Sequence, residues 1–159
     1  NIGYALLDQG RAAEAEPEFA RGLALLEKGM GTDSPDIVET LGGYAKAMAD
    51  LKRSDEAEGL FRRVRTITDA RLAPAHPVGL GGADAYAAFL LDRDRPADAL
   101  DQLRGSLGPL TARAGGGRDW RTAVRGAGPM FERRVEASWR LATLEQVATV
   151  SATDRSSTP

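Results

Sequence analysis

The triplet Glu14-Ala15-Glu16 recurs as Glu56-Ala57-Glu58, 42 residues further along the chain, and a second step of 42 reaches Asp98-Ala99-Leu100. Other residues share this spacing. They are Ile2, Tyr44 and Tyr86; Gly3, Ala45 and Ala87; Leu6, Met48 and Leu90; and Phe19, Phe61 and Leu103. A fixed period of this length without gaps indicates an array of stacked repeats. Such an array favours a binding or scaffolding protein over an enzyme.

Each period contains two segments with a helical pattern. Apolar residues mark one buried stripe on the second segment of the first period, at positions 19, 23, 26 and 30. Ser34-Pro35-Asp36 predicts the start of the next helix, because serine can cap it, proline fits its first turn and aspartate favours its positive end. His76-Pro77 repeats this start. The pattern therefore predicts an all-α chain of helical hairpins.

The repeat register divides the chain into parts. It predicts three units within residues 1–110, at about 1–33, 34–75 and 76–112, of which the first is truncated. A linker is expected at 111–128, where Gly115-Gly116-Gly117 forms a flexible break. A helix at 129–148, with apolar rows that include Ala137 and Trp139, is expected to cap the last unit, which otherwise exposes its apolar face. The polar tail at 149–159 is expected to be disordered.

Composition excludes several classes of site. The chain has 159 residues and no cysteine, which removes disulfides, thiolate metal sites and cysteine nucleophiles. Its one histidine, His76, makes neither a zinc site nor a Cys-His pair. We therefore expect no cofactor, no metal and no catalysis. The net charge is −2, and no apolar run approaches the roughly 20 residues that span a bilayer, so we expect no membrane partner and a cytoplasmic protein.

Charged residues repeat as well. Asp8, Asp50 and Asp92 share one phase of the period, and Arg11, Arg53 and Arg95 lie three residues further on. Local ion pairs at the turns are the favoured interpretation, and a charged groove rim is the alternative. Arginines also gather near Trp120 and Trp139. Such a set can bind single-stranded nucleic acid, but packing against an acidic repeat face or a partner domain is favoured, so nucleic acid is not the expected partner.

These residues together resemble a tetratricopeptide repeat (TPR) array, in the 42-residue variant of kinesin light chains and many bacterial proteins. The family expects a small residue in each first helix, and Gly3, Ala45 and Ala87 supply it. It expects another early in each second helix, and Ala15, Ala57 and Ala99 supply it. An aromatic residue follows four positions later as Phe19 and Phe61, whereas Leu103 departs from the pattern. The resemblance implies a right-handed TPR-type superhelical solenoid of helical hairpins with a C-terminal capping helix.

The resemblance also implies a binding surface. In this family, first-helix residues one turn apart hold an extended peptide in a concave groove. Carried onto this sequence, these partner-binding positions are Asn1, Tyr4, Lys46, Asp50, Asp84, Ala88, Leu91 and Asp92. Asn1 matches the asparagine that grips the peptide backbone, but Gly43 and Ala85 replace it in later units. Two interpretations stay open, which are recognition of a protein or extended peptide in the groove and a rigid spacer that packs a neighbouring domain on the same face.

A second resemblance concerns residues 131–142. This arginine-rich stretch is similar to the helix that follows such repeats in bacterial proteins with a caspase-like CHAT protease domain, and the 159 residues of this chain do not include such a domain. The alternative function is therefore the sensor or regulatory arm of a larger CHAT-type protease. Because the chain opens at Asn1 within a helical pattern, we interpret it as a piece of a longer protein. Self-association through Ile2, Leu6 and Leu7 of the truncated first unit also stays open.

Overall fold

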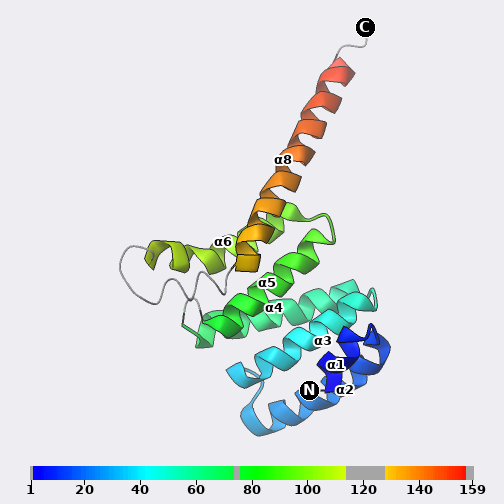
Figure 1. Cartoon of the computed structure of the whole chain (residues 1–159), viewed down its shortest axis with the longest axis vertical. Coiled ribbons are helices and arrows are strands. Elements are labelled where there is room, and N and C mark those ends of the chain that lie inside the picture. Colours follow the sequence, from blue (N-terminus) through cyan, green and yellow to red (C-terminus); the bar gives the residue numbers. More distant parts are fainter. Residues whose placement is uncertain (1, 74–75, 114–127, 157–159) are drawn as a thin grey trace.

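Every regular element that the structure describes is a helix (Figure 1). The computed structural model describes residues 2–73, 76–113 and 128–156. Its elements are α1 (Ile2–Asp8), α2 (Ala12–Met30), the 3-10 helix η1 (Pro35–Ile37), α3 (Val38–Asp50), α4 (Ser54–Arg71), α5 (Pro77–Leu91), α6 (Pro96–Arg113) and α8 (Gly128–Ser156). The pairs α1–α2, α3–α4 and α5–α6 are the three expected hairpins.

The helix starts follow the expected local chemistry. At η1, the backbone N–H of Asp36 donates to Ser34 Oγ at 3.3 Å, directly before α3. At α5, the backbone N–H of Val78 donates to His76 Nδ1, also at 3.3 Å. Each cap satisfies one donor that the first helical turn leaves unpaired. His76 therefore has the structural role of a helix cap.

The last helix is longer than the sequence pattern predicted. It ends at Ser156, not near residue 148, so residues 149–156, which were assigned to the tail, belong to the helix in this structure. Residues 130–156 contain neither glycine nor proline, so no residue in this stretch interrupts the helix. Helix α6 reaches Arg113 and so includes the first residues of the expected 111–128 linker. The glycine break at 115–117 and Trp120 lie outside the described residues.

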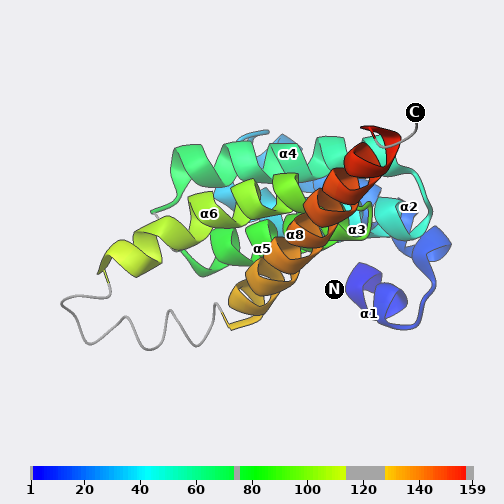
Figure 2. The same cartoon turned by 90° about the horizontal axis from the view of Figure 1, so that it is seen from above.

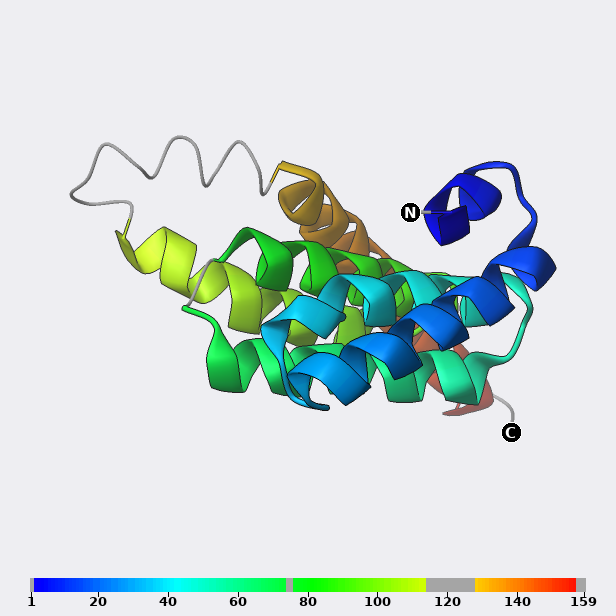
Figure 3. The same ribbon diagram turned by 90° about the horizontal axis from the view of Figure 1, so that it is seen from below.

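The helices form two rows. Successive first helices touch each other, from α1 to α3, α3 to α5 and α5 to α8. Successive second helices are bridged by long polar side chains, such as Arg63 of α4 with Glu27 of α2 at 2.6 Å. The first helices α1, α3 and α5 have the closer spacing, so they form the inner side of a curved array. We call the surface of these three helices the first-helix face. Helix α8 and the α1–α2 hairpin lie at opposite ends of the array (Figure 1), which Figures 2 and 3 show from above and from below.

The positions that repeat in the sequence form the core. The early small residue of each second helix is completely buried, at Ala15, Ala57 and Ala99. The small residues of α3 and α5, Ala45 and Ala87, are completely buried as well. Because each side chain is only a methyl group, neighbouring helices approach closely at these points. The interior is therefore made of similar clusters repeated along the array.

Helix α8 covers the last hairpin with one side only. Met130 and Ala137 are buried against α5 and α6. Val135, Trp139 and Leu144 are exposed, Trp139 by 76%. The apolar row that contains Trp139 was expected to lie on the last repeat; its first residue, Phe131, packs there, but Val135 and Trp139 do not. A helix on the end of the array has neighbours on one side, so the opposite part of a broad apolar stripe stays outside.

Candidate functional site on the first-helix face

Tyr4 marks the α1 end of the first-helix face. Its hydroxyl donates to the backbone carbonyl of Glu39 at 2.8 Å, and its ring meets Phe19 edge-on at 5.2 Å between centroids. Burial, followed by the nearby charge of Glu39, raises the pKa of Tyr4. The half-buried side chain therefore joins α1 to α3, which limits its use for a partner. Asn1, the expected backbone-gripping residue, lies outside the described residues.

Lys46 and Asp50 occupy the middle of the face on α3. Lys46 Nζ lies 3.1 Å from Asp50 Oδ2, and both side chains are about half exposed, at 56% and 43%. An exposed pair of this kind contributes little to stability, so its two members can be re-paired at small cost. Both members of this pair therefore remain accessible to a partner.

Helix α8 occupies part of the α5 end of the face. Arg133 Nε donates to Asp84 Oδ1 at 2.7 Å, and Arg140 Nη1 donates to the carbonyl oxygen of Leu91 at 2.8 Å. Both pairs are 49 residues apart, so α8 runs alongside α5 in the same direction. Asp84 and Leu91 are therefore engaged by α8 and do not form an open contact surface.

The remaining expected positions of α5 are more accessible. Ala88 is half-buried and Asp92 is exposed at the end of the helix. The sequence pattern did not identify Arg133 and Arg140 as neighbours of this site. Their spacing of seven residues, which places both on one side of a helix, was the available signal. The accessible part of the expected site is thus Lys46, Asp50, Ala88 and Asp92.

The truncated first unit leaves less apolar surface than expected. Leu7 is buried in a core cluster with Ala15 and Phe19 of α2, and Leu6 is half-buried against the same cluster. Ile2 is exposed by 67%. Of the three residues expected to support self-association, Leu7 is therefore not available, because α2 already covers it.

The repeated arginines pair differently from the expectation. Arg11, Arg53 and Arg95 do not bind the aspartates that precede them. Each donates instead to an acid three residues later, at 2.6 Å, and these acids are Glu14, Glu56 and Asp98. Each arginine directly precedes a second helix whose first turn carries the acid, so the pair forms within that turn.

Two of these arginines also connect neighbouring units. Arg53 reaches Glu16 at 3.3 Å, and Arg95 reaches Glu58 at 2.8 Å, both across 37 residues. Glu58 also accepts from Tyr86 and Arg62. Its side chain is 17% exposed. The hydrogen bond from Arg95 is the main reason that the pKa of Glu58 lies below its usual value.

Replacing Glu58 with glutamine is expected to lower the free energy of unfolding by about 1–2 kcal/mol at neutral pH. Because the folded-state pKa is depressed, the carboxylate stabilises the fold fully above its unfolded value, near 4.5, and this contribution is lost as the pH falls through the folded value. The difference between wild type and Glu58→Gln should therefore shrink in acid. Urea titrations between about pH 7 and pH 3 measure it.

The control is Glu18→Gln, which removes an equal charge from a pair with Arg21 in which the arginine is 75% exposed. Its effect at neutral pH should stay within about 0.5 kcal/mol. A Glu58→Gln protein as stable as the control would contradict a role for Glu58 in joining the units.

Two other features bear on the chemistry of the site. Among the residues that the structure describes, no helix has the length and apolar character needed to cross a membrane. Within the same residues, no cluster of three or more His, Asp or Glu side chains could hold a metal ion.

Comparisons with known proteins agree with this architecture. The model of the tetratricopeptide repeat family matches residues 1–70. Two crystal structures are similar to this chain, each at 17% identity. Both are of the nearly identical TPR-like repeats of a kinesin light chain from Podosopora anserina, and one of them carries a point substitution. The substituted form gives a TM-score of 0.66 over 98% of this chain and 74% of that chain, and the other gives 0.65 over 96% and 73%. None of the curated proteins matches the chain. The chain therefore has the fold of a helical-repeat solenoid similar to those TPR-like structures, and its residues 1–70 match the model of the tetratricopeptide repeat family.

Proposed function

We propose that this chain is a protein–protein interaction module that binds an extended segment of a partner across the first-helix face. The supporting observation is that the exposed positions keep one register. Lys46 and Ala88 are 42 residues apart, as are Asp50 and Asp92, so the two helices present equivalent positions to one strand of a partner. The proposal assigns no reaction to the chain.

The exposed charges of the first-helix face favour a basic partner segment. Asp8, Asp50 and Asp92 are exposed at equivalent positions of α1, α3 and the end of α5, and Lys46 is the positive residue among them. A row of carboxylates with one repeat spacing can meet lysine or arginine side chains along an extended peptide. Recognition would be sensitive to salt, because the charges are exposed.

Asp92→Lys is expected to weaken binding of a basic peptide about five- to tenfold, because the substitution turns an attractive contact into a repulsive one. Fluorescence polarisation against a library of extended peptides identifies the ligand and measures the change. Lys46→Glu should strengthen the same peptides by a smaller factor. The control is Asp101→Lys, an equal charge change at a residue of α6 whose side chain is 75% exposed.

Two results would contradict this proposal. One is the absence of saturable binding by any peptide while circular dichroism shows an intact fold. The other is an equal loss of affinity in Asp92→Lys and Asp101→Lys, which would indicate a general effect of net charge. The first result would favour a spacer that packs a neighbouring domain.

A second candidate rests on α8. Its exposed Val135 and Trp139 lie on one side of the helix together with Phe131 and Ala142, and they form an apolar surface that a neighbouring domain could cover. We propose as the alternative that the array is the regulatory arm of a larger protein, with a CHAT-type protease domain as the candidate neighbour. Iodide quenching of Trp139 fluorescence, in a Trp120→Phe background, decides this. If iodide quenches Trp139 in the larger protein as strongly as in this chain, no neighbouring domain packs on Trp139.

A further inference from the structure

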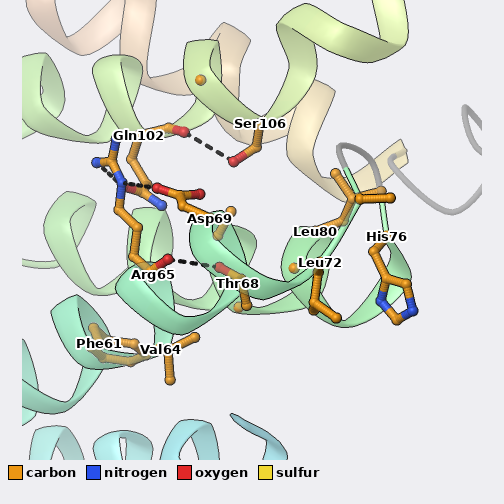
Figure 4. A pocket seen from close by; sticks show the side chains of 15 residues that line it. Phe61, Val64, Arg65, Thr68, Asp69, Leu72, His76, Leu80, Gln102 and Ser106 are labelled. Carbon is orange, nitrogen blue, oxygen red and sulfur yellow. Dashed lines mark hydrogen bonds and ion pairs between the residues drawn. The ribbon is translucent and has the colours of Figure 1, made fainter. Parts of the chain in front are cut away.

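A hollow of about 270 Å³ lies between α4 and α6 at the first turns of α5 (Figure 4). Apolar side chains form part of its wall, at Phe61, Val64 and Leu80. Polar side chains form another part, at Arg65, Asp69 and Gln102, and Asp69 forms an ion pair with Arg65. The hollow is separate from the first-helix face, since second helices supply most of its lining.

The preceding junction of the array has aliphatic residues at the equivalent positions. Between α2 and α4, aliphatic side chains form a closed cluster that includes Leu23, Ile37, Leu41 and Val64, each at most 7% exposed. A step of 42 residues replaces these four by Arg65, Gly79, Ala83 and Ser106. All four replacements line the hollow. The same place in the repeat is therefore a filled core at one junction and an open, partly polar space at the next.

The glycines of α5 keep this space open. Gly79 stands where Ile37 fills the earlier junction, and a Cβ at Gly79 would lie 3.6 Å from Thr68 Cβ, an ordinary contact distance. The position therefore has room for a side chain and lacks one. Gly82 differs, because a Cβ there would lie 2.7 Å from Val64 Cγ1. Gly82 permits α5 to approach α4, whereas Gly79 leaves volume unoccupied.

A positioned cation stands at the hollow. Arg65 Nη1 donates to Gln102 Oε1 at 2.7 Å, and Arg65 Nε donates to Asp69 at 3.3 Å. Gln102 is 5% exposed, so its amide is held in place and fixes the guanidinium. The Arg65 side chain is 49% exposed. Its Nη2 atom lies 3.9 Å from the place of a Cβ added to Gly105, where no side chain is present. A guanidinium held in this way has a remaining edge for an oxyanion.

We propose that this hollow binds a small branched aliphatic carboxylate. The aliphatic part takes the place of the side chains that Ile37 and Leu41 supply in the earlier junction, against Phe61 and Leu80. The carboxylate binds the guanidinium of Arg65. The volume lies just below the range of about 300–1,000 Å³ that drug-sized ligands occupy, so a small acid fits and a large cofactor does not.

The test uses 4-methylpentanoate as the probe and isothermal titration calorimetry as the readout. We expect saturable binding with a dissociation constant in the millimolar range, as for other ligands of this size. The neutral analogue 4-methylpentan-1-ol should bind at least tenfold more weakly. Arg65→Met, which keeps an apolar stem and removes the charge, should reduce affinity for the acid at least tenfold and leave binding of the alcohol unchanged.

A second variant tests the space itself. Gly79→Ile combined with Ala83→Leu restores the side chains of the earlier junction and should abolish binding while the thermal midpoint rises. The control is Gly81→Ala, where an added Cβ meets no atom within 4 Å, and its affinity should equal that of wild type. The proposal is overturned if the acid gives no saturable signal, if the alcohol binds as well as the acid, or if the folded Arg65→Met protein keeps full affinity.

Discussion

Replacing Phe19 with alanine is expected to lower the free energy of unfolding by about 3–5 kcal/mol, the range for deletion of a buried aromatic ring. Phe19 is 1% exposed. A Cβ added to Gly3 would lie 2.7 Å from its ring, and one added to Gly43 would lie 2.5 Å from its Cζ atom. The backbones of α1 and α3 therefore approach the ring closely, with Tyr4 edge-on to it. Removal leaves a cavity that three helices share and that they cannot close without moving.

The loss should be confined to one end of the array. In a linear array each unit contacts its neighbours only, so a defect in the first unit unfolds that part first. Hydrogen exchange should show lost protection in α1 and α2, with α5 and α6 close to wild type. The control Leu25→Ala, at a residue that is 73% exposed, should change stability by less than about 0.5 kcal/mol. An equal loss of protection in all helices would contradict independent behaviour of the units.

The fold could be predicted from the sequence because the repeat expresses local requirements three times. The caps at Ser34 and His76 depend on residues within one turn, and the buried small residues at 15, 57 and 99 depend on adjacent helices of the repeat. All of them have the expected role. Each of these roles recurs at a spacing of 42 residues. A match to the helical-hairpin pattern at one position is therefore checked by the equivalent positions of the other units. The all-α hairpin architecture follows from these positions alone.

The features that the sequence did not predict depend on single residues or on contacts between distant segments. The pairing of Arg53 with Glu16 and of Arg95 with Glu58 depends on how one unit is placed on the next. The sequence pattern supplied the residues but could not show which acid each arginine reaches. The engagement of Asp84 by Arg133 likewise needs the position of α8, which lies outside the 42-residue register.

The glycines of α5 are a second case in which the sequence pattern does not show which atoms a residue faces. In the sequence, Gly79 and Gly82 only weaken the predicted opening of a helix by roughly 1 kcal/mol each. In the structure they differ, because Gly82 is required by a close approach to Val64 and Gly79 faces unoccupied space. A helical pattern records that both residues are small but contains no information on the atoms opposite them. A comparison between equivalent junctions of the array supplies that information.

Gly43→Ala is expected to destabilise the protein by about 1–3 kcal/mol, although alanine has the higher helix propensity. The added Cβ would lie 2.5 Å from Phe19 Cζ and 3.0 Å from Tyr4 Cζ, so the ring or the helix must move. Gly42 is the matched control, since it precedes Gly43 in α3 and a Cβ there meets no atom within 4 Å. Gly42→Ala should stabilise by about 0.5–1 kcal/mol. Urea titrations of both variants measure this difference in sign.

A double-mutant cycle identifies the cause. In a Phe19→Leu background the ring that obstructs position 43 is absent, so Gly43→Ala should lose most of its cost and can become stabilising through helix propensity alone. The coupling between positions 19 and 43 should then be about 1–3 kcal/mol, while positions 19 and 42 should show a coupling near zero. Equal costs of Gly43→Ala in both backgrounds would mean that the ring does not set the requirement for glycine. Loss of the cost would establish that the close crossing of α1, α2 and α3 depends on an aromatic ring seated on two glycines, Gly3 and Gly43.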